Sequence, residues 1–303
     1  MISLRQLRYL DALATHLHFR KAADAVSVSQ PALSMQIKEL ERDLGVMLIE
    51  RLPNRVRLTR EGEEVAARAR AILTDVQDLH DYARQAGQPL TGPLRLGIIP
   101  SIAPYLLPRI LPVLSSAHPE LRLTIRETLT QALTEELQEG KLDAIIIALP
   151  ADTAGLISEP LFEDRFLLAR CASDTLDRDR RVLPDDLEKE NILLLEEGHC
   201  LRDQALNYCQ NVSTAGGNTL GATSLATVMQ MVAAGYGVTL LPEICADFEV
   251  RDERVTLLRF ADPQPARTVG LVWRKSSPRS KDFGILVDTL RKTVGKAGCR
   301  LAG

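Results

Sequence analysis

The sequence lacks any apolar run near the roughly 18–20 residues that a membrane-spanning helix needs. Its first residues also lack the basic-then-apolar layout of a signal peptide. No two of its cysteines form a C-x-x-C pair, so a zinc ribbon or a thioredoxin-type motif is unsupported. We therefore expect a cytoplasmic chain with no membrane partner, metal or cofactor, in a compartment that keeps thiols reduced. Free, catalytic or sensing thiols are then favoured over structural disulfides for the five cysteines, Cys171, Cys200, Cys209, Cys245 and Cys299.

At 303 residues the chain is long for one domain, so two or three domains are expected. Hydrophobic residues make up 45% of it and charged residues 25%, as in an ordinary globular protein. The net charge of −3 is unevenly spread, because residues 1–60 hold ten Lys and Arg against six Asp and Glu. That local +4 leaves −7 on the other 243 residues. A basic amino-terminal unit on an acidic body indicates nucleic-acid binding at one end.

Three short helices are predicted at the amino terminus. Leucines recur at helical spacing over residues 4–13, and a second helix is expected over 19–26. Ser29 can cap a third helix, which has Pro31 in its first turn and ends at Gly45. The second and third helices, joined by a tight turn, form a helix-turn-helix, whose second helix fits a DNA major groove.

The outer face of the third helix is polar and basic, and a two-strand wing that turns at Pro53-Asn54 follows it. Polar side chains on this helix could reach base edges, while Lys38 and the arginines of the wing could hold phosphates. The candidate DNA-binding residues are Gln30, Pro31, Ser34, Gln36 and Lys38 on the helix and Arg51, Arg55 and Arg57 on the wing. A small three-helix domain with a solvated polar face would show a similar pattern.

Several segments of this region match a known family. They read FRKAAD at 19–24, VSQPALS at 28–34, IKELE at 37–41 and LGV at 44–46. Together they closely resemble the DNA-binding domain of LysR-type transcriptional regulators, unbroken over about sixty residues. The resemblance implies a nucleoid-associated regulator that binds double-stranded promoter DNA and acts on RNA polymerase.

A longer helix is predicted from Thr59 onward, with apolar residues alternating in steps of four and three. This seven-residue repeat is typical of a two-helix coiled coil, although a single amphipathic helix on a globular body would also produce it. The predicted seam consists of Val65, Ala69, Ile72, Val76, Leu79, Ala83 and Ala86. The seam predicts a dimer, as a two-fold operator requires, and the family resemblance extends the dimer to a homotetramer. Gly87, Pro89 and residues 91–93 should end the helix and form a hinge.

From Leu94 onward, apolar strands alternate with helical stretches, which predicts an α/β body with a parallel sheet. One set of elements ends with a buried strand at 142–149, and a second set runs from 166–170 to 238–241. A strand at 267–273 then returns, and a helix near 281–294 closes the chain. Two lobes with two crossovers resemble the periplasmic-binding-protein-like regulatory domain of the LysR family, whose ligand site lies between the lobes.

The expected fold class is therefore α/β overall, in three parts. Residues 1–58 form a winged helix-turn-helix, 59–90 a dimerisation helix, and 91–303 a two-lobe α/β regulatory domain. Lobe I covers about 91–164 and 268–303, and lobe II covers about 165–267.

Cys200 and Cys209 form the most informative pair of residues, because no Gly or Pro lies between them. If this stretch is helical, the two Cα atoms lie about 13–14 Å apart along the axis and on opposite faces. A disulfide tolerates only about 4.4–6.8 Å. The pair can therefore close only by breaking its own helix, which is the behaviour of a redox switch. The spacing alone also fits two unrelated core cysteines.

Five segments of the body resemble the peroxide-sensing members of the LysR family. They are IPS with PYLLP at 99–108, GHCLRDQA at 198–205 with Cys209, ATSL at 222–225, MVAAG at 231–235, and RTVGLV at 267–272. The resemblance implies that Cys200 is the peroxide-reactive thiol and Cys209 its resolving partner. These relatives usually have threonine where this chain has Ser101, so the missing methyl group could loosen the pocket.

The chemistry of such a site can be argued from its residues. Attack on a peroxide O–O bond needs a thiolate, and an ordinary cysteine is mostly protonated at neutral pH. Cys200 is expected at a helix N-terminus, where the dipole favours an anion, with Arg202 nearby. The residues expected to bind peroxide or stabilise the thiolate are Ser101, Thr130, His199 and Arg267. Plainer roles exist for each, namely a helix cap for Thr130, a loop position for His199 and a surface ion pair for Arg267. Asp203 is expected to cap the helix or to pair with Arg202, and Cys245 to lie in the core.

We therefore predict a peroxide-sensing transcriptional regulator rather than an enzyme. Hydrogen peroxide, the signal, would convert Cys200 to a sulfenic acid that condenses with Cys209. The remodelled regulatory domain would then alter promoter binding and activate oxidative-stress genes, until a thioredoxin- or glutaredoxin-type reductant restores the thiols. One alternative is a metabolite-responsive regulator of the same family with incidental cysteines. Another is a thiol peroxidase, against which stand the helix-turn-helix and the lack of a recognisable recycling motif.

Overall fold

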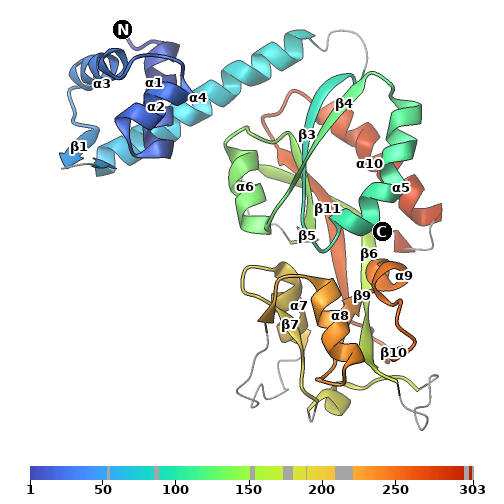
Figure 1. The fold of residues 1–303 in the computed structure, drawn as a ribbon. Coiled ribbons are helices and arrows are strands. Elements are labelled where there is room, and N and C mark those ends of the chain that lie inside the picture. Colours follow the sequence, from blue (N-terminus) through green and yellow to red (C-terminus); the bar gives the residue numbers. More distant parts are fainter. Residues whose placement is uncertain are drawn as a thin grey trace. The chain divides into compact units, whose positions relative to one another are not determined.

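The computed structural model of the chain describes residues 1–52, 55–84, 89–150, 154–172, 180–188, 190–208, 221–296 and 300–301. The chain forms two compact units, Met1–Ala86 and Gly87–Gly303 (Figure 1). Among the described helices, none is long and apolar enough to cross a membrane. Some residues singled out by the sequence lie outside the described ones, namely Pro53, Asn54, Ala86, Gly87, Cys209 and Cys299.

The amino-terminal unit is the predicted winged helix-turn-helix. Its elements are α1 (Leu4–His16), α2 (Phe19–Ala25), α3 (Gln30–Leu44), the wing strands β1 (Ile49–Leu52) and β2 (Arg55–Leu58), and α4 (Arg60–Arg84). Side-chain oxygens cap the starts of α1 and α3, and Gly45 ends α3 in the left-handed conformation that glycine favours. Buried leucines and alanines of the first three helices form one core with the start of α4.

The long helix α4 packs its first half against the core of this unit. Ala69 is fully buried there and Val65 contacts the same core, while Arg70 forms an ion pair with Asp11 of α1 at 2.8 Å. The prediction that Val65 and Ala69 face a partner helix is therefore wrong, because the chain's own α1 covers that part of α4.

The second unit is a mixed α/β structure. Its strands are β3 (Gly92–Ile98), β4 (Leu121–Glu127), β5 (Ala144–Leu149), β6 (Leu156–Cys171), β7 (Leu194–Leu195), β8 (Gly221–Ala222), β9 (Thr239–Pro242), β10 (Val255–Arg259), β11 (Ala266–Arg274) and β12 (Arg300–Leu301). Its α-helices are α5 (Ala103–Ala117), α6 (Thr130–Gln138), α7 (Cys200–Tyr208), α8 (Leu225–Ala233), α9 (Ala246–Glu249) and α10 (Ser280–Lys296), with short 3-10 helices at Pro184–Leu187 and Glu243–Cys245.

The main sheet has the strand order β10-β6-β11-β5-β3-β4, and β9 and β12 also pair with β6. β3 runs parallel to both β4 and β5, but β11 pairs antiparallel with both β5 and β6. The prediction of parallel strands therefore holds for β3 with β4 and β5 and for the small β7-β8 pair. The rest of the main sheet is antiparallel, because β11, β9 and β10 all run opposite to β6. β3 also begins two residues before the predicted Leu94. Pro93 is tolerated there because at that point β3 pairs with β4 on one side only.

The long strand β6 connects the two lobes of this unit. Its first part pairs with β11, and its last part pairs with β9 and β10 (Figure 1). One lobe carries α5, α6 and α10, and the other carries α7 and α8 (Figure 1). The ends of β3 and the starts of α6 and α7 meet where the lobes join, at the cavity described next.

A candidate thiol pocket and a candidate DNA-binding face

A small cavity brings together most of the residues that the sequence predicted for a thiol site. Its volume is about 10 Å³, close to the smallest space that holds one water molecule. The end of β3, the start of α6 and the start of α7 each contribute residues to its wall. The lining residues are Ile99, Pro100, Ser101, Leu129, Thr130, Gly198, His199, Cys200 and Leu201.

Cys200 is the first residue of α7, as predicted, and its half-buried thiol is free. Gly198 permits the turn into this helix, because it adopts a positive φ of 91°. A Cβ atom at Gly198 would lie 3.1 Å from the Leu129 side chain, so the two lobes approach closely beside the thiol. The helix runs to Tyr208, the residue directly before Cys209.

Ser101 is held on both of its oxygens by one buried guanidinium group. Arg267 Nη1 donates to the Ser101 hydroxyl at 2.9 Å, and Nη2 donates to its backbone carbonyl at 3.0 Å. Since the hydroxyl oxygen accepts from Arg267, its own proton remains available to donate to a molecule in the cavity. Arg267 itself does not line the cavity, so its hydrogen bonds act on Ser101 rather than on a ligand.

Asp164 is the functional candidate that the sequence pattern did not reveal. It lies opposite Arg267 in the pairing of β6 with β11 and accepts from Arg267 Nε at 3.0 Å. It also accepts from the backbone N–H of Ile244 at 3.0 Å, and the side chains of both Asp164 and Arg267 are fully buried. Asp164 stands between Glu163 and Arg165 in the sequence, so no local pattern distinguishes it from its exposed or half-buried neighbours.

The electrostatics of this pair favour the charged form of Arg267. Burial lowers the pKa of the guanidinium group, but the attraction of Asp164, and then of Cys245 and Cys200, more than offsets that effect, so the pKa is raised overall. Arg267 therefore keeps its positive charge in the buried site because Asp164 pairs with it.

Thr130 supplies an unpaired hydroxyl group to the same cavity. Its Oγ1 atom is buried and has no hydrogen-bond partner in the described part of the chain. Thr130 lies at the first position of α6, where the residue before it makes no side-chain cap, so the plainer role of a helix cap is not realised. A buried hydroxyl without a partner is unfavourable unless a bound molecule satisfies it.

The neighbours of Cys200 in the sequence differ in their placement. His199 is half-buried in the cavity wall. Arg202 Nη1 instead donates to the backbone carbonyl of Leu195 at 3.1 Å, so its guanidinium group holds β7. The expected pair of Arg202 with Asp203 is not formed among the described contacts, because that carbonyl takes the guanidinium group.

Two other free thiols lie in the described residues. Cys245 is fully buried, as predicted, and burial raises the pKa of its thiol well above the ordinary value, which makes it a poor nucleophile. Cys171 is half-buried, and its sulfur lies 3.7 Å from the carbonyl oxygen of Ala233. Neither residue lines the small cavity.

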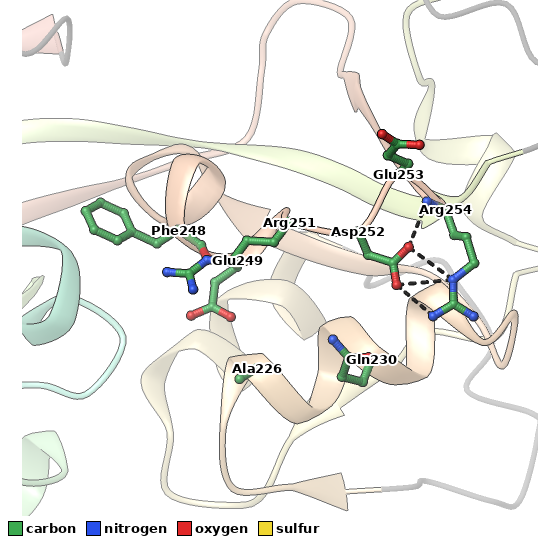
Figure 2. Close-up of a pocket in the computed structure, with 8 residues that line it drawn as sticks. All are labelled: Ala226, Gln230, Phe248, Glu249, Arg251, Asp252, Glu253 and Arg254. Carbon is green, nitrogen blue, oxygen red and sulfur yellow. Dashed lines mark hydrogen bonds and ion pairs between the residues drawn. The ribbon is translucent and has the colours of Figure 1, made fainter.

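A larger and more open pocket of about 910 Å³ lies on the surface of the lobe that carries α8 (Figure 2). Its wall combines α8, α9 and the segment after α9, and consists of Ala226, Gln230, Phe248, Glu249, Arg251, Asp252, Glu253 and Arg254. Asp252 and Arg254 pair with each other, and hydrogen bonds from Arg254 lower the pKa of Asp252 to about 2 (Figure 2). These lining residues include no thiol and no imidazole, so this pocket does not offer the chemistry of the small cavity.

The predicted DNA-binding residues lie on or near the exposed side of α3 and on the wing. Gln30, Pro31 and Lys38 are exposed, and Ser34 is half-buried. Gln36 is also half-buried, and its amide donates to Glu39 Oε2 at 2.6 Å. Arg51 and Arg55 belong to the paired strands β1 and β2, which also carry the exposed Arg57.

Comparison with known proteins places this geometry in a family. Residues 4–63 match the model of the bacterial regulatory helix-turn-helix protein of the lysR family, and residues 87–295 match the LysR substrate binding domain. The DNA-binding transcriptional dual regulator OxyR of Escherichia coli K12 is 43% identical over 96% of this chain and 95% of its own.

Two further matches are a second regulator and a solved structure with a bound molecule. The HTH-type transcriptional regulator EstR of Acinetobacter baylyi is 42% identical over 96% of both chains. A solved structure of a Corynebacterium glutamicum OxyR mutant with hydrogen peroxide bound has a TM-score of 0.68 and 34% identity, and the match covers 97% of this chain and 93% of that one. With both of its units matched and its whole length aligned, this chain belongs to the LysR family of transcriptional regulators.

Proposed function

We propose that this regulator senses hydrogen peroxide through Cys200 and that Cys209 closes a disulfide with it. The main support for the proposal is the small cavity beside Cys200. Two hydroxyl groups in its wall can each form a further hydrogen bond. Ser101 has a proton to donate, and Thr130 can donate and accept. A neutral molecule of about the size of water, with donors and acceptors at both ends, matches that lining. The similarity to OxyR and to a peroxide-bound relative supports the same ligand.

The reaction balances as a two-electron oxidation of two thiols. The Cys200 thiolate attacks one peroxide oxygen, the O–O bond breaks, and the leaving hydroxide takes a proton to become water. Cys200 is then a sulfenic acid. The Cys209 thiolate attacks its sulfur, an S–S bond forms, and the hydroxyl group leaves as a second water. A dithiol reductant of the thioredoxin or glutaredoxin type reverses the oxidation by thiol–disulfide exchange.

Three features of the site assist the first step. The start of α7 and the positive charge of Arg267 stabilise negative charge that develops at the site during the attack. Ser101 and Thr130 orient the peroxide and stabilise charge as it develops on the leaving oxygen. His199, in the wall of the same cavity, can donate a hydrogen bond to that oxygen.

The second step links disulfide formation to a conformational change in the lobe that carries α7. α7 runs from Cys200 to Tyr208, and an intact helix of that length separates the Cα atoms of these two residues by about 12 Å along the axis. Cys209 directly follows Tyr208 in the sequence, so we propose that a disulfide with Cys200 requires α7 to unfold. We propose that the altered lobe surface changes how copies of the chain associate as dimers and tetramers, and thereby how they contact promoter DNA and RNA polymerase.

A second candidate function is a regulator of the same family that responds to another small molecule. We keep it as a candidate because EstR, at 42% identity, has a name that does not mention hydrogen peroxide. The pocket of about 910 Å³ lies within the usual size range of small-molecule sites. In that case DNA binding would depend on a ligand and would not depend on the thiols.

A peptide mass map of the full-length protein, before and after one equivalent of hydrogen peroxide, distinguishes the two functions. We expect a linked peptide that joins Cys200 to Cys209. Cys200→Ser should abolish it, while Cys171→Ser, which removes a free thiol away from the cavity, should leave it unchanged. A wild-type protein that stays fully reduced after this treatment would rule out the peroxide sensor in favour of the ligand-responsive regulator.

A further inference from the structure

Helix α3 carries two stripes of side chains on opposite sides. The buried stripe consists of Leu33, Ile37, Leu40 and the half-buried Leu44, spaced at helical intervals. A second stripe consists of Pro31, Met35, Lys38 and Arg42, each two residues before a member of the first. Two residues correspond to about 200° around a helix, so the second stripe points almost directly away from the core.

Met35 is a long apolar side chain on this outward stripe, in which Pro31 is also apolar. Its side chain is 56% exposed, whereas the Lys38 and Arg42 that follow it are basic and can be drawn to phosphates. Because Met35 makes no contribution to the core of its unit, the fold does not account for an apolar side chain there. The residue is available to a partner that covers α3 and that the neighbouring positive charges attract.

Double-stranded DNA is the partner that this unit fits, because residues 4–63 match the helix-turn-helix of the lysR family. The amino-terminal half of such a recognition helix contacts base edges, and Met35 is the sixth of fifteen residues in α3. The base edges in the major groove present hydrogen-bond donors and acceptors, and the C5-methyl group of thymine is the apolar feature among them. Methionine suits such a contact, since it is long, flexible and polarisable.

We propose that Met35 packs against a thymine methyl group in the major groove and thereby helps to determine which sequence this regulator prefers. This inference uses only the DNA-binding unit. It holds or fails independently of the proposed reaction of Cys200.

Replacing thymine by deoxyuridine tests the contact, since it removes the methyl group and keeps the base pair. A duplex is first selected from a random pool with the reduced, full-length wild type. Each thymine of one half-site is then replaced in turn, and affinity is measured by fluorescence anisotropy at fixed salt. We expect one replacement to weaken wild-type binding about fourfold, the effect of losing one buried methyl group. Met35→Ala should bind the two duplexes equally.

Two further variants separate this contact from other effects. Met35→Leu keeps an apolar side chain and should retain the preference for thymine, while Met47→Ala shortens an exposed methionine outside α3 and should keep the wild-type profile. The dependence of affinity on salt should be the same for Met35→Ala as for wild type, because no phosphate contact is lost. The proposal is overturned if no thymine is sensitive in the wild type, or if Met35→Ala shows the same sensitive thymine as the wild type.

Discussion

The buried pair of Arg267 and Asp164 determines how Ser101 meets the cavity. Arg267 uses two nitrogens on Ser101 and two on Asp164, so the guanidinium plane is fixed by partners on both sides. Its position fixes which way the Ser101 hydroxyl can donate. A change at Asp164 should therefore affect the cavity although Asp164 does not line it.

Asp164→Asn should destabilise the regulatory unit strongly. Asparagine can still accept a hydrogen bond from Arg267, but it leaves a buried positive charge without a counter-charge, which typically costs about 3–5 kcal/mol. Urea unfolding followed by the fluorescence of Trp273, the only tryptophan of the chain, measures this loss in β11 itself. Asp252→Asn is the matched control, because it removes an exposed ion pair with Arg254, and such pairs contribute little. Equal unfolding midpoints for the two variants would contradict the role given to the buried pair.

The sequence pointed to Ser101, Thr130, His199 and Cys200 as one group, and the structure brings these four into one cavity wall. The sequence motifs were enough to predict this grouping, because each motif lies at the end of a strand or at the start of a helix, where residues from different elements converge. Asp164 escaped prediction because its partner is 103 residues away and the pairing register of β6 with β11 is not encoded locally. The contact of Arg202 with Leu195 spans only seven residues and was missed because it depends on how α7 packs beside β7.

Helix α7 is the element on which the proposed switch depends. It is nine residues long, the side chains of Leu201 and Ala205 are buried, and Cys200, Leu206 and Tyr208 pack half-buried against the same core. Isolated helices of this length are marginal in water, and α7 depends on its packing. An element of this kind can unfold without loss of the sheet beside it.

Oxidation should therefore change amide exchange in one segment of the chain and not in another. With stoichiometric hydrogen peroxide, backbone amides between Leu201 and Tyr208 should lose protection, while those of the buried strand β5 (Ala144–Leu149) keep it. Hydrogen–deuterium exchange with mass spectrometry measures both segments in the same sample. Cys200→Ser treated with peroxide is the control and should match the reduced wild type. A disulfide that formed with unchanged exchange over α7 would show that the bridge does not need to unfold this helix.

At the scale of elements, helical periodicity was the more reliable guide. Helices α2, α3 and α10 lie within one to three residues of their predicted bounds. Strand direction was not predictable in the same way. The alternation of strands and helices favours a parallel sheet, but β11 pairs antiparallel with β5 and β6, and β6 also pairs antiparallel with β9, β10 and β12. The 16-residue strand β6 was seen only in its second half, since its first half has fewer buried residues.

At the scale of the whole molecule, the thiol pocket and the DNA-binding face belong to different compact units. A change in α7 can then alter promoter binding through the way in which copies of the chain pair. The described part of α4 offers a surface for pairing, because Ile72 and Leu79 are 45% and 67% exposed while Ala69 and Thr74 face the chain's own core. The predicted seam is thus shorter than the heptad pattern suggests and begins near Ile72.

Two negative charges in this shorter seam should prevent the dimer. Val76→Asp combined with Leu79→Asp places like charges from both partners at the apolar contact, where burial of an unpaired carboxylate is strongly unfavourable. The full-length variant should then be monomeric by light scattering and should bind a two-half-site duplex more weakly than the wild type. Ala71→Asp is the matched control, since that exposed position lies about 120° around α4 from the seam and should leave the mass unchanged. If the double variant keeps the mass of the wild type, the chain associates through another surface, and the apolar residues of α4 beyond Ile72 need a different explanation.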